Sequence, residues 1–290
     1  MNIWDLAVQP FVEFMFMRRA LIGTTALALG YAPLGVFLLL RRMSLMGDAI
    51  SHAILPGVAL GFLLCGMSLP ALSLGGLLAG LAVALAAGAM ARLTILREDA
   101  SLAVFYLISL SLGVLLVSLK GSNVDLLHLL FGSILALDNN SLLLLASVTT
   151  ITLPVLAIIY RPLVIECFDP VFLRTIRGGG SAIHLIFLSL VVLNLVSGFQ
   201  ALGTLMAMGL MMLPAATARL WARSLDGMIA TAIPVAVMAV YIGLLLSYHM
   251  DLPSGPAIIL TSGGILMLSL LIAPYQGLFK RLLTHTHLEG

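Results

Sequence analysis

The stretch Ala20–Leu40, ALIGTTALALGYAPLGVFLLL, contains 21 residues without a charged side chain and is followed directly by Arg41 and Arg42. About 20 mostly apolar residues in a helix are enough to cross the roughly 30 Å hydrocarbon core of a bilayer. The stretch therefore predicts a membrane-spanning helix, and the arginines mark the membrane surface at which it ends.

Further stretches of the same kind follow along the chain, and together they predict nine spans, or eight if one weak segment fails. The other eight lie near residues 48–66, 69–91, 100–119, 141–160, 182–198, 201–218, 228–248 and 254–273. A shorter apolar piece, Val124–Leu137, contains Asp125 and His128 and is too short to cross comfortably. We interpret it as a re-entrant or interfacial helix.

The composition supports the same fold class, an all-α integral membrane protein built as a polytopic helical bundle. Hydrophobic residues make up 61% of the chain and charged residues 9%, compared with about 25% charged residues in soluble domains. The formal net charge of +2 excludes a strongly basic nucleic-acid-binding surface. Cys65 and Cys167 fall near opposite ends of the spans, so no disulfide between them is expected.

The distribution of cations predicts the orientation, because short cytoplasmic loops collect Arg and Lys. Most of the cations fall on one side of the nine-span arrangement, and Arg18, Arg19 and Lys120 are the exceptions. That side is predicted to be the cytoplasm. Residues 1–17 then form an N-terminal interfacial segment, residues 18–278 the transmembrane domain, and residues 279–290 a cytoplasmic tail.

The longest charged loop, residues 161–181, is predicted to be cytoplasmic and to contain a short helix. Asp169 is a suitable N-cap, Pro170 fits the first helical position, and the glycines at 178–180 can end the helix. From these residues alone, an ordinary connector and a docking element are equally compatible with the pattern.

Two ionisable residues inside the second predicted span require an explanation, since an Asp at a helix centre costs roughly 2.5–3.5 kcal/mol on insertion. Asp48 and His52 are one helical turn apart and so share a face. A helix that starts at Arg42 places His52 about 15 Å along its axis, near the bilayer midplane. Pro56 follows and predicts a bent or interrupted helix at this depth.

A carboxylate and an imidazole on one face supply two ligands for a divalent first-row cation such as Mn, Zn or Fe. Two ligands do not define a site. The structural alternative is that Asp48 caps the span or pairs with Arg41, and that His52 donates to a carbonyl oxygen.

The other polar residues near the spans give weaker signals. One group lies at the outer ends of the predicted spans and consists of Asp125, His128, His249 and Asp251. These residues could attract metal ions to the entrance of a pore, but they are better interpreted as solvated interfacial residues. His285 and His287 in the tail are compatible with a flexible metal-binding tract, but a role for them is not favoured.

Several catalytic motifs are absent from the sequence. It contains no G-x-x-x-x-G-K-[ST] loop, no H-E-x-x-H helix and no G-x-S-x-G elbow. We therefore expect the chain not to be an enzyme and not to hydrolyse a nucleotide by itself.

The run RRMSLMGDAISHAILPG, Arg41–Gly57, resembles the signature of the permease subunits of bacterial ABC importers for zinc, manganese and iron. Three further stretches are similar to the same family; they are LLHLLFGSILAL at 126–137, FDP at 168–170 and ALGTLMAMGLMMLPAATARL at 201–220. The resemblance extends from about residue 20 to residue 275.

This resemblance implies a type II ABC importer-like fold in a homodimer of the bacterial cytoplasmic membrane. The partners would be a separate cytoplasmic ATPase and an extracytoplasmic metal-binding protein, and no cofactor other than the transported cation, Mn or Zn and possibly Fe, is expected. Asp48 and His52 would then belong to the cation path. The helix carrying Asp169, Pro170, Phe172 and Leu173 would dock on the ATPase.

Two alternatives remain. An ion-coupled secondary transporter would be favoured by charged pairs in several spans and by an inverted repeat, and neither is evident in the sequence. An intramembrane metal-dependent hydrolase would need a third ligand and a general base close to Asp48 and His52.

Overall fold

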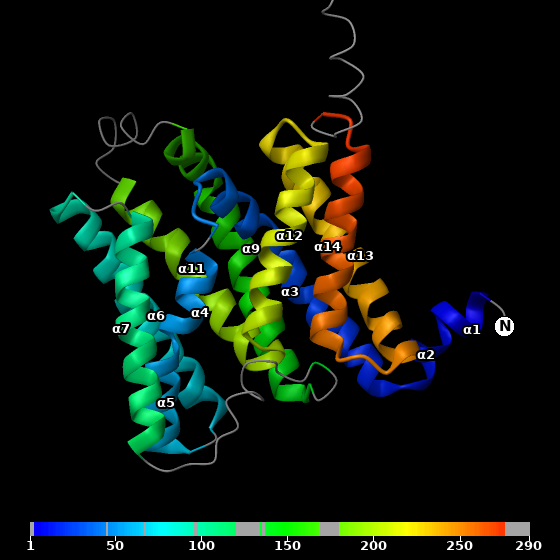
Figure 1. The fold of residues 1–290 in the computed structure, drawn as a ribbon, viewed down its shortest axis with the longest axis horizontal. Coiled ribbons are helices and arrows are strands. Elements are labelled where there is room, and N and C mark those ends of the chain that lie inside the picture. The colour runs from blue at the N-terminus through cyan, green and yellow to red at the C-terminus, as the bar shows by residue number, and fades with distance from the viewer. Residues whose placement is uncertain are drawn as a thin grey trace, which may run out of the picture.

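The computed structural model describes residues 3–44, 46–66, 68–95, 98–119, 134, 137–168 and 180–275. Within these residues the chain is helical throughout and contains no β-strand. The helices stand side by side as a bundle, and two short helices at the N-terminus extend from one edge (Figure 1). The all-α prediction is confirmed.

The bundle is built from long helices that run alternately in opposite directions. In chain order they are α3 (Met15–Leu40), the consecutive pair α4 (Met46–Ala53) and α5 (Leu55–Cys65), α6 (Leu69–Leu93), α7 (Glu98–Leu119), α9 (Asn139–Phe168), α11 (Gly180–Leu202), α12 (Thr204–Trp221), α13 (Leu225–Met250) and α14 (Ser254–Ile272). Each of the nine predicted spans thus corresponds to helical structure in the described part of the chain.

Seven of these helical stretches are long and apolar enough to cross a membrane. They are Met15–Leu40, Met46–Cys65, Pro70–Met90, Asn139–Phe168, Ala182–Phe199, Leu225–Met250 and Ser254–Ile272. The predicted count of nine or eight is therefore not confirmed. The apolar part of α7 is shorter, Ala100–Leu116, and α12 includes Arg219 in its last turn.

The helices form two groups that are joined by α9 and α11. In one group α5 packs on α6, and α7 contacts α4, α5 and α6; in the other, α3, α12, α13 and α14 pack together. Helix α11 contacts α6 of the first group and α12 of the second, and α9 packs between α11 and α3 (Figure 1). Helix α11 thus bridges the two groups, with α9 packed on it, and α4 also contacts α12 directly.

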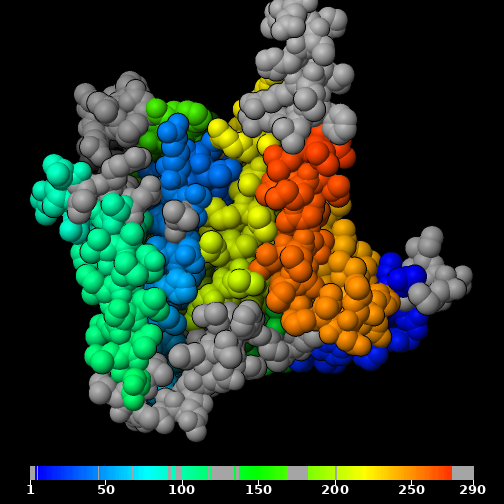
Figure 2. Space-filling model, in the orientation of Figure 1, coloured from blue at the N-terminus to red at the C-terminus, as the bar shows by residue number. Residues whose placement is uncertain are grey.

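The outer surface of the bundle is apolar, as expected for a protein whose solvent is lipid. On α14, for example, Leu260, Met267 and Leu268 are largely exposed. Helices α7 and α14 form part of the outer surface in the space-filling view (Figure 2). Apolar surface on this scale is unfavourable in water, at about 25 cal/mol per Å².

A polar cluster ties three helices together inside the bundle. The Tyr31 hydroxyl of α3 donates to the backbone carbonyl of Asn194 in α11 at 2.9 Å, and Asn194 Nδ2 donates to Thr152 Oγ1 of α9 at 2.7 Å. The Thr149 hydroxyl adds a bond to the carbonyl of Ala26 at 2.9 Å. Buried polar groups are stable when they are bonded to one another in this way.

Helix α9 continues beyond the end predicted from the sequence. The sequence predicts a span ending near residue 160 and a loop from Arg161, but the helix continues through Pro162 to Phe168. Leu163 is fully buried in the bundle, and this packing holds the extra turns in helical form. The predicted loop 161–181 is therefore shortened at its start by eight residues, which belong to α9.

The N-terminal segment forms α1 (Ile3–Ala7) and α2 (Gln9–Glu13) before α3 begins at Met15. The boundary predicted at residue 17 thus lies inside the first turn of α3. The Tyr241 hydroxyl of α13 donates to the carbonyl of Ala7 at 2.8 Å, and the Tyr241 ring stacks on Phe11. These contacts attach the segment to the side of α13.

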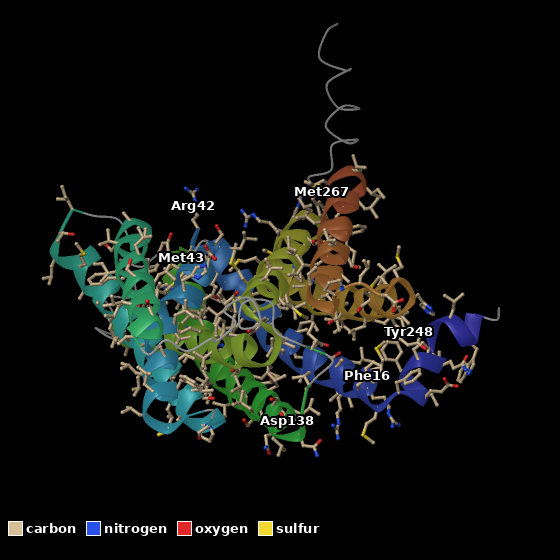
Figure 3. All side chains as sticks on the ribbon, turned by 60° about the horizontal axis from the view of Figure 1, so that its bottom comes forward. Phe16, Arg42, Met43, Asp138, Tyr248 and Met267 are labelled. Atoms are coloured by element: carbon tan, nitrogen blue, oxygen red, sulfur yellow. The ribbon has the colours of Figure 1, made fainter. Side chains whose placement is uncertain are left out.

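Most of the arginine-bearing connections lie at one end of the bundle. The α3–α4 connection, the α6–α7 connection, the C-terminal end of α9 and the α12–α13 connection all lie there (Figure 1). Arg42 lies at this end, and Asp138, which precedes α9, lies at the opposite end (Figure 3). At that opposite end the Asp138 carboxylate caps α9 and accepts a bond from the Ser141 N–H at 2.8 Å.

Candidate functional site

Helix α4 presents the two predicted cation ligands next to each other. Asp48 Oδ1 and His52 Nε2 are 3.5 Å apart, and their side chains are 49% and 28% exposed. The shared helical face inferred from their spacing is thus confirmed. The pair is accessible from outside the protein core and is therefore able to exchange a ligand.

The structural alternatives proposed for Asp48 do not match its position. Asp48 lies inside the first turn of α4, which begins at Met46, so it is not the residue that precedes the helix. Arg41 is not its partner, because Arg41 Nη2 lies 2.6 Å from Glu166 Oε1. The alternative in which Asp48 pairs with Arg41 is therefore not found.

The span that carries the pair is divided into two helices at Ile54, although the Ile54 N–H still bonds to the Ile50 carbonyl at 3.1 Å. Helix α4 ends at Ala53 and α5 begins at Leu55, as the proline at position 56 predicted. Pro56 has no N–H to donate to the carbonyl of His52, four residues earlier. The Ser109 hydroxyl of α7 donates to the carbonyl of Ala53, the last residue of α4, at 2.8 Å.

The imidazole of His52 retains an unused nitrogen. Its ring lies beside Tyr106 of α7, with 6.2 Å between the ring centroids. Its Nδ1 is buried and has no hydrogen-bond partner among the described residues. A buried ring nitrogen without a partner is uncommon, and a neutral imidazole nitrogen is a common metal ligand.

Close backbone packing fixes α5 against its neighbours. A Cβ on Gly57 would lie 2.0 Å from the carbonyl oxygen of Gly75 in α6, and a Cβ on Gly75 would lie 2.2 Å from that of Gly57. Only glycine allows this approach, which is typical of helix contacts in membranes. Helix α5 is thus held tightly against α6, and α4, which precedes α5, carries the polar pair.

Asp48 and His52 are two candidate ligands, and no third His, Cys, Asp or Glu joins them within the part of the chain that the structure describes. There, no group of three or more His, Cys, Asp or Glu side chains gathers in a way that could hold a metal ion. An intramembrane hydrolase would need such a group to retain its metal.

The two polar residues at the end of α13 have local roles. His249 Nε2 lies 2.9 Å from the carbonyl oxygen of Leu6 and so helps to attach the N-terminal segment. Asp251 adopts a left-handed conformation, with φ 50° and ψ 37°, and ends the helix. These contacts agree with the interpretation as interfacial residues.

The remaining predicted residues lie outside the described residues, and what was predicted for them stays a prediction. They are Asp169, Pro170, Phe172 and Leu173 of the docking helix, Asp125 and His128 near the outer surface, and His285 and His287 in the tail.

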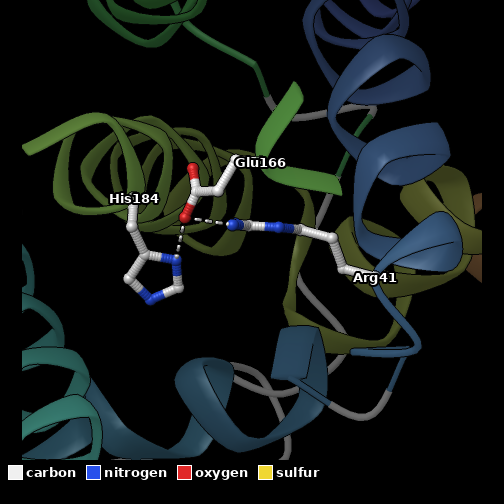
Figure 4. A network of polar contacts seen from close by, with 3 residues as sticks. All are labelled: Arg41, Glu166 and His184. Carbon is white, nitrogen blue, oxygen red and sulfur yellow. Dashed lines mark ion pairs between the residues drawn. The ribbon is translucent and has the colours of Figure 1, made fainter. Parts of the chain in front are cut away.

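A cluster that sequence reasoning missed lies at the arginine-bearing end of the bundle (Figure 4). Glu166 Oε1 lies 2.6 Å from Arg41 Nη2 and 3.5 Å from His184 Nδ1. On the sequence alone, Glu166 belongs to the predicted loop and His184 to an apolar span. The sequence did contain one signal for this cluster: Glu166 and His184, which can pair, lie just before and just after residues 169–179.

Comparison with known proteins places this geometry in context. The chain matches the ABC 3 transport family over residues 13–273. It is 34% identical over 264 residues to the manganese import system permease protein ScaB of Streptococcus parasanguinis, covering 91% of this chain and 93% of that protein. It is 32% identical over 273 residues to the manganese transport system membrane protein MntC of Listeria monocytogenes, covering 94% and 96%.

A solved structure shows the same arrangement of helices. The chain superposes on a chain of PsaBC from Streptococcus pneumoniae, solved in complex with Fab, with a TM-score of 0.84 and 32% sequence identity. The match covers 97% of this chain and 99% of that chain.

Proposed function

Because the chain belongs to the ABC 3 transport family, we propose that it is the permease subunit of an ABC importer that carries a divalent transition-metal cation across the bacterial inner membrane. Manganese is the favoured cation. The observation that carries this choice is the likeness, along more than nine-tenths of the chain, to relatives named as manganese permeases.

The protein is a multi-pass membrane protein, and we propose that all nine helical passes cross the membrane. Helix α12 is less apolar than its neighbours, but it packs against α3, α13 and α14, so much of its surface faces protein. A helix enclosed by others needs less apolar surface than one that faces lipid. Helix α7 has a short apolar part, Ala100–Leu116. It is nevertheless proposed to cross the membrane, because α6 ends at one end of the bundle and α9 begins at the other (Figure 1).

Asp48 and His52 are proposed to bind the cation on its way through the membrane. Two ligands that are each about 2.1 Å from a metal lie roughly 3.0–3.4 Å apart at right-angle or tetrahedral geometry. The observed separation of 3.5 Å is thus close to that of a ligating pair. The Asp48 carboxylate offsets the charge of the dehydrated cation, and His52 adds a nitrogen ligand that suits first-row metals.

Energy for transport is proposed to come from a separate cytoplasmic ATPase, since the sequence has no phosphate-binding loop. Asp169, Pro170, Phe172 and Leu173 would form its docking surface. A second copy of the chain would complete the pore, and an extracytoplasmic metal-binding protein would deliver the cation. The glycines and broken helix near the polar pair provide a point at which access can alternate.

The function is tested by uptake of radioactive manganese in a bacterium that lacks its own manganese importers. Cells expressing the chain with its ATPase and binding protein should accumulate manganese, and an ATPase with its phosphate-binding lysine replaced should abolish uptake. Uptake that survives this replacement would identify a secondary transporter. Uptake of zinc alone would show that the metal assignment is wrong.

The docking surface is tested by Phe172→Asp and Leu173→Asp in the same cells. Both variants should reach the membrane in normal amounts, because the changes lie outside the spans, but they should fail to retain the ATPase on purification. Normal uptake by both variants would show that the ATPase docks elsewhere.

A further inference from the structure

Three helices meet at the Arg41–Glu166–His184 cluster. Arg41 caps the C-terminal end of α3, Glu166 lies in the last turn of α9, and His184 lies near the start of α11. The side chains of Arg41 and Glu166 are 9% and 10% exposed, and that of His184 is 9% exposed. The Arg41 guanidinium also lies 5.2 Å from the centre of the Phe187 ring of α11. One arginine thus contacts both neighbouring helices.

Stability alone does not account for this cluster. A buried ion pair often contributes no more than apolar side chains of similar volume, because removing both charges from water is costly. The cluster is also incompletely bonded: Arg41 Nη1 and Glu166 Oε2 are buried and have no hydrogen-bond partner among the described residues. The best attested use of such a pair is to fix how elements sit relative to one another.

The position of the cluster in the chain shows which elements it fixes. Glu166 lies two residues before the end of α9, and His184 lies four residues after the start of α11, so both ends of the segment 169–179 are joined through one carboxylate. The same three helices are joined again, deeper in the bundle, by the hydrogen bonds of Asn194. They are therefore held together at two levels.

Arg41 also begins the turn that leads into α4. The Met43 N–H bonds to the Leu38 carbonyl at 2.9 Å, and the Arg42 N–H bonds to the Leu39 carbonyl at 3.2 Å. With Arg42 at φ 58°, these bonds form a Schellman motif. The Met46 N–H bonds in turn to the Met43 carbonyl at 3.0 Å, so backbone hydrogen bonds link the end of α3 to the start of α4, and Asp48 lies seven residues after Arg41.

We infer that Arg41, Glu166 and His184 form a positioning clamp that ties both ends of the segment 169–179 to the α3–α4 turn. This inference rests on the proposed function, in which that segment docks on the ATPase. The clamp passes movement of the segment to α4 and so couples ATP hydrolysis to the position of Asp48 and His52. Its residues do not touch the cation; they act through the helices they join.

The clamp is tested first without any transport measurement. Spin labels at Ser44, after α3, and Ala182, at the start of α11, are both at exposed positions. In the purified protein with Cys65→Ser and Cys167→Ser, the distribution of distances between the labels should be narrow, and Glu166→Gln should broaden it. His184→Gln, a milder change that leaves the Arg41 contact intact, should broaden it less. Unchanged distributions in both variants would overturn the clamp, whatever the protein transports.

The second test measures coupling in the complex with the ATPase. Glu166→Gln should reduce manganese uptake per folded molecule at least about fivefold, the lower limit of typical coupling between sites, while ATP hydrolysis persists. The control is Thr149→Val, which removes a buried bond between α9 and α3 away from the clamp. It should lower thermal stability and leave uptake per hydrolysed ATP unchanged.

Equal losses of uptake and hydrolysis in Glu166→Gln would overturn the coupling role, because a structural defect lowers both together. So would an equal loss of coupling in Thr149→Val. Absence of manganese uptake in the unmodified complex would instead contradict the proposed function, and the spin-label result would still decide whether the clamp exists.

Discussion

Two ionisable clusters among the described residues differ in how they are assembled. Asp48 and His52 come from successive turns of one short helix, are partly exposed, and lie 3.5 Å apart. Arg41 and Glu166 come from different helices, are nearly buried, and lie 2.6 Å apart. The loose and accessible pair suits a passing ion, which must be able to leave, whereas the tight and enclosed pair suits a fixed joint between helices.

The first prediction separates the two roles and carries the largest effect. Asp48→Asn should lower manganese uptake at least about tenfold, since disturbing even the outer partners of a metal ligand has effects of about 10–100-fold. Protein level should be unchanged or higher, because a carboxylate hinders membrane insertion and its neutral amide does not. Uptake of radioactive manganese and immunoblotting of membranes measure the two quantities.

Ser51→Ala is the matched control for Asp48→Asn. Ser51 lies on the same helix, and its hydroxyl bonds within that helix, to the Gly47 carbonyl at 2.8 Å. Uptake by this variant should remain close to normal. Near-normal uptake by Asp48→Asn would show that transport does not need the carboxylate charge and would contradict the proposed cation-binding role of Asp48.

The second prediction concerns the buried pair Arg41–Glu166. It measures what this pair contributes to the free energy of unfolding, separately from its proposed role in coupling. Glu166→Gln leaves Arg41 charged and unpaired and should lower the free energy of unfolding by about 3 kcal/mol. The double variant Arg41→Met with Glu166→Leu should recover most of that loss, because no uncompensated charge remains. Thermal denaturation in detergent measures both, and a double variant as unstable as Glu166→Gln would contradict the interpretation.

The third prediction has the smallest effect and concerns the packing of α5, which follows α4, against α6. Gly75→Ala places a methyl group against the Gly57 carbonyl and should destabilise the protein by about 1–3 kcal/mol, as overpacking does. Gly88→Ala, on the same helix, meets no atom within 4 Å and should leave the midpoint of thermal denaturation unchanged or slightly higher. Equal midpoints for the two variants would show that α5 and α6 are free to separate.

The same contrast explains which features could be predicted from the sequence. Asp48 and His52 are four residues apart, so helical periodicity alone places them on one face, and Pro56 alone predicts the break that follows. These are local properties of the chain. The Arg41–Glu166–His184 cluster depends instead on how three helices pack, and apolar spans carry little information about which neighbours they choose.

The errors of the sequence-based prediction have the same origin. Arg161 suggested the end of a span because a cation marks a membrane surface, but the burial of Leu163 extends α9 beyond it. Likewise the proximity of Arg41 to Asp48 along the chain suggested an ion pair, whereas the end of α9 supplies a nearer carboxylate. In both cases tertiary packing overrode the local pattern.

The attachment of the N-terminal segment to α13 has a consequence for how the protein is made. Tyr241 and the Ala7 carbonyl with which it bonds are 234 residues apart in the chain. Ribosomes add about 5–20 residues per second, so the first two helices wait roughly 12–47 s before their binding surface has been synthesised. During that time they can contact α3, which follows them directly in the chain, but not α13. Biogenesis thus begins with a segment that reaches its final place only when nearly the whole chain has been inserted.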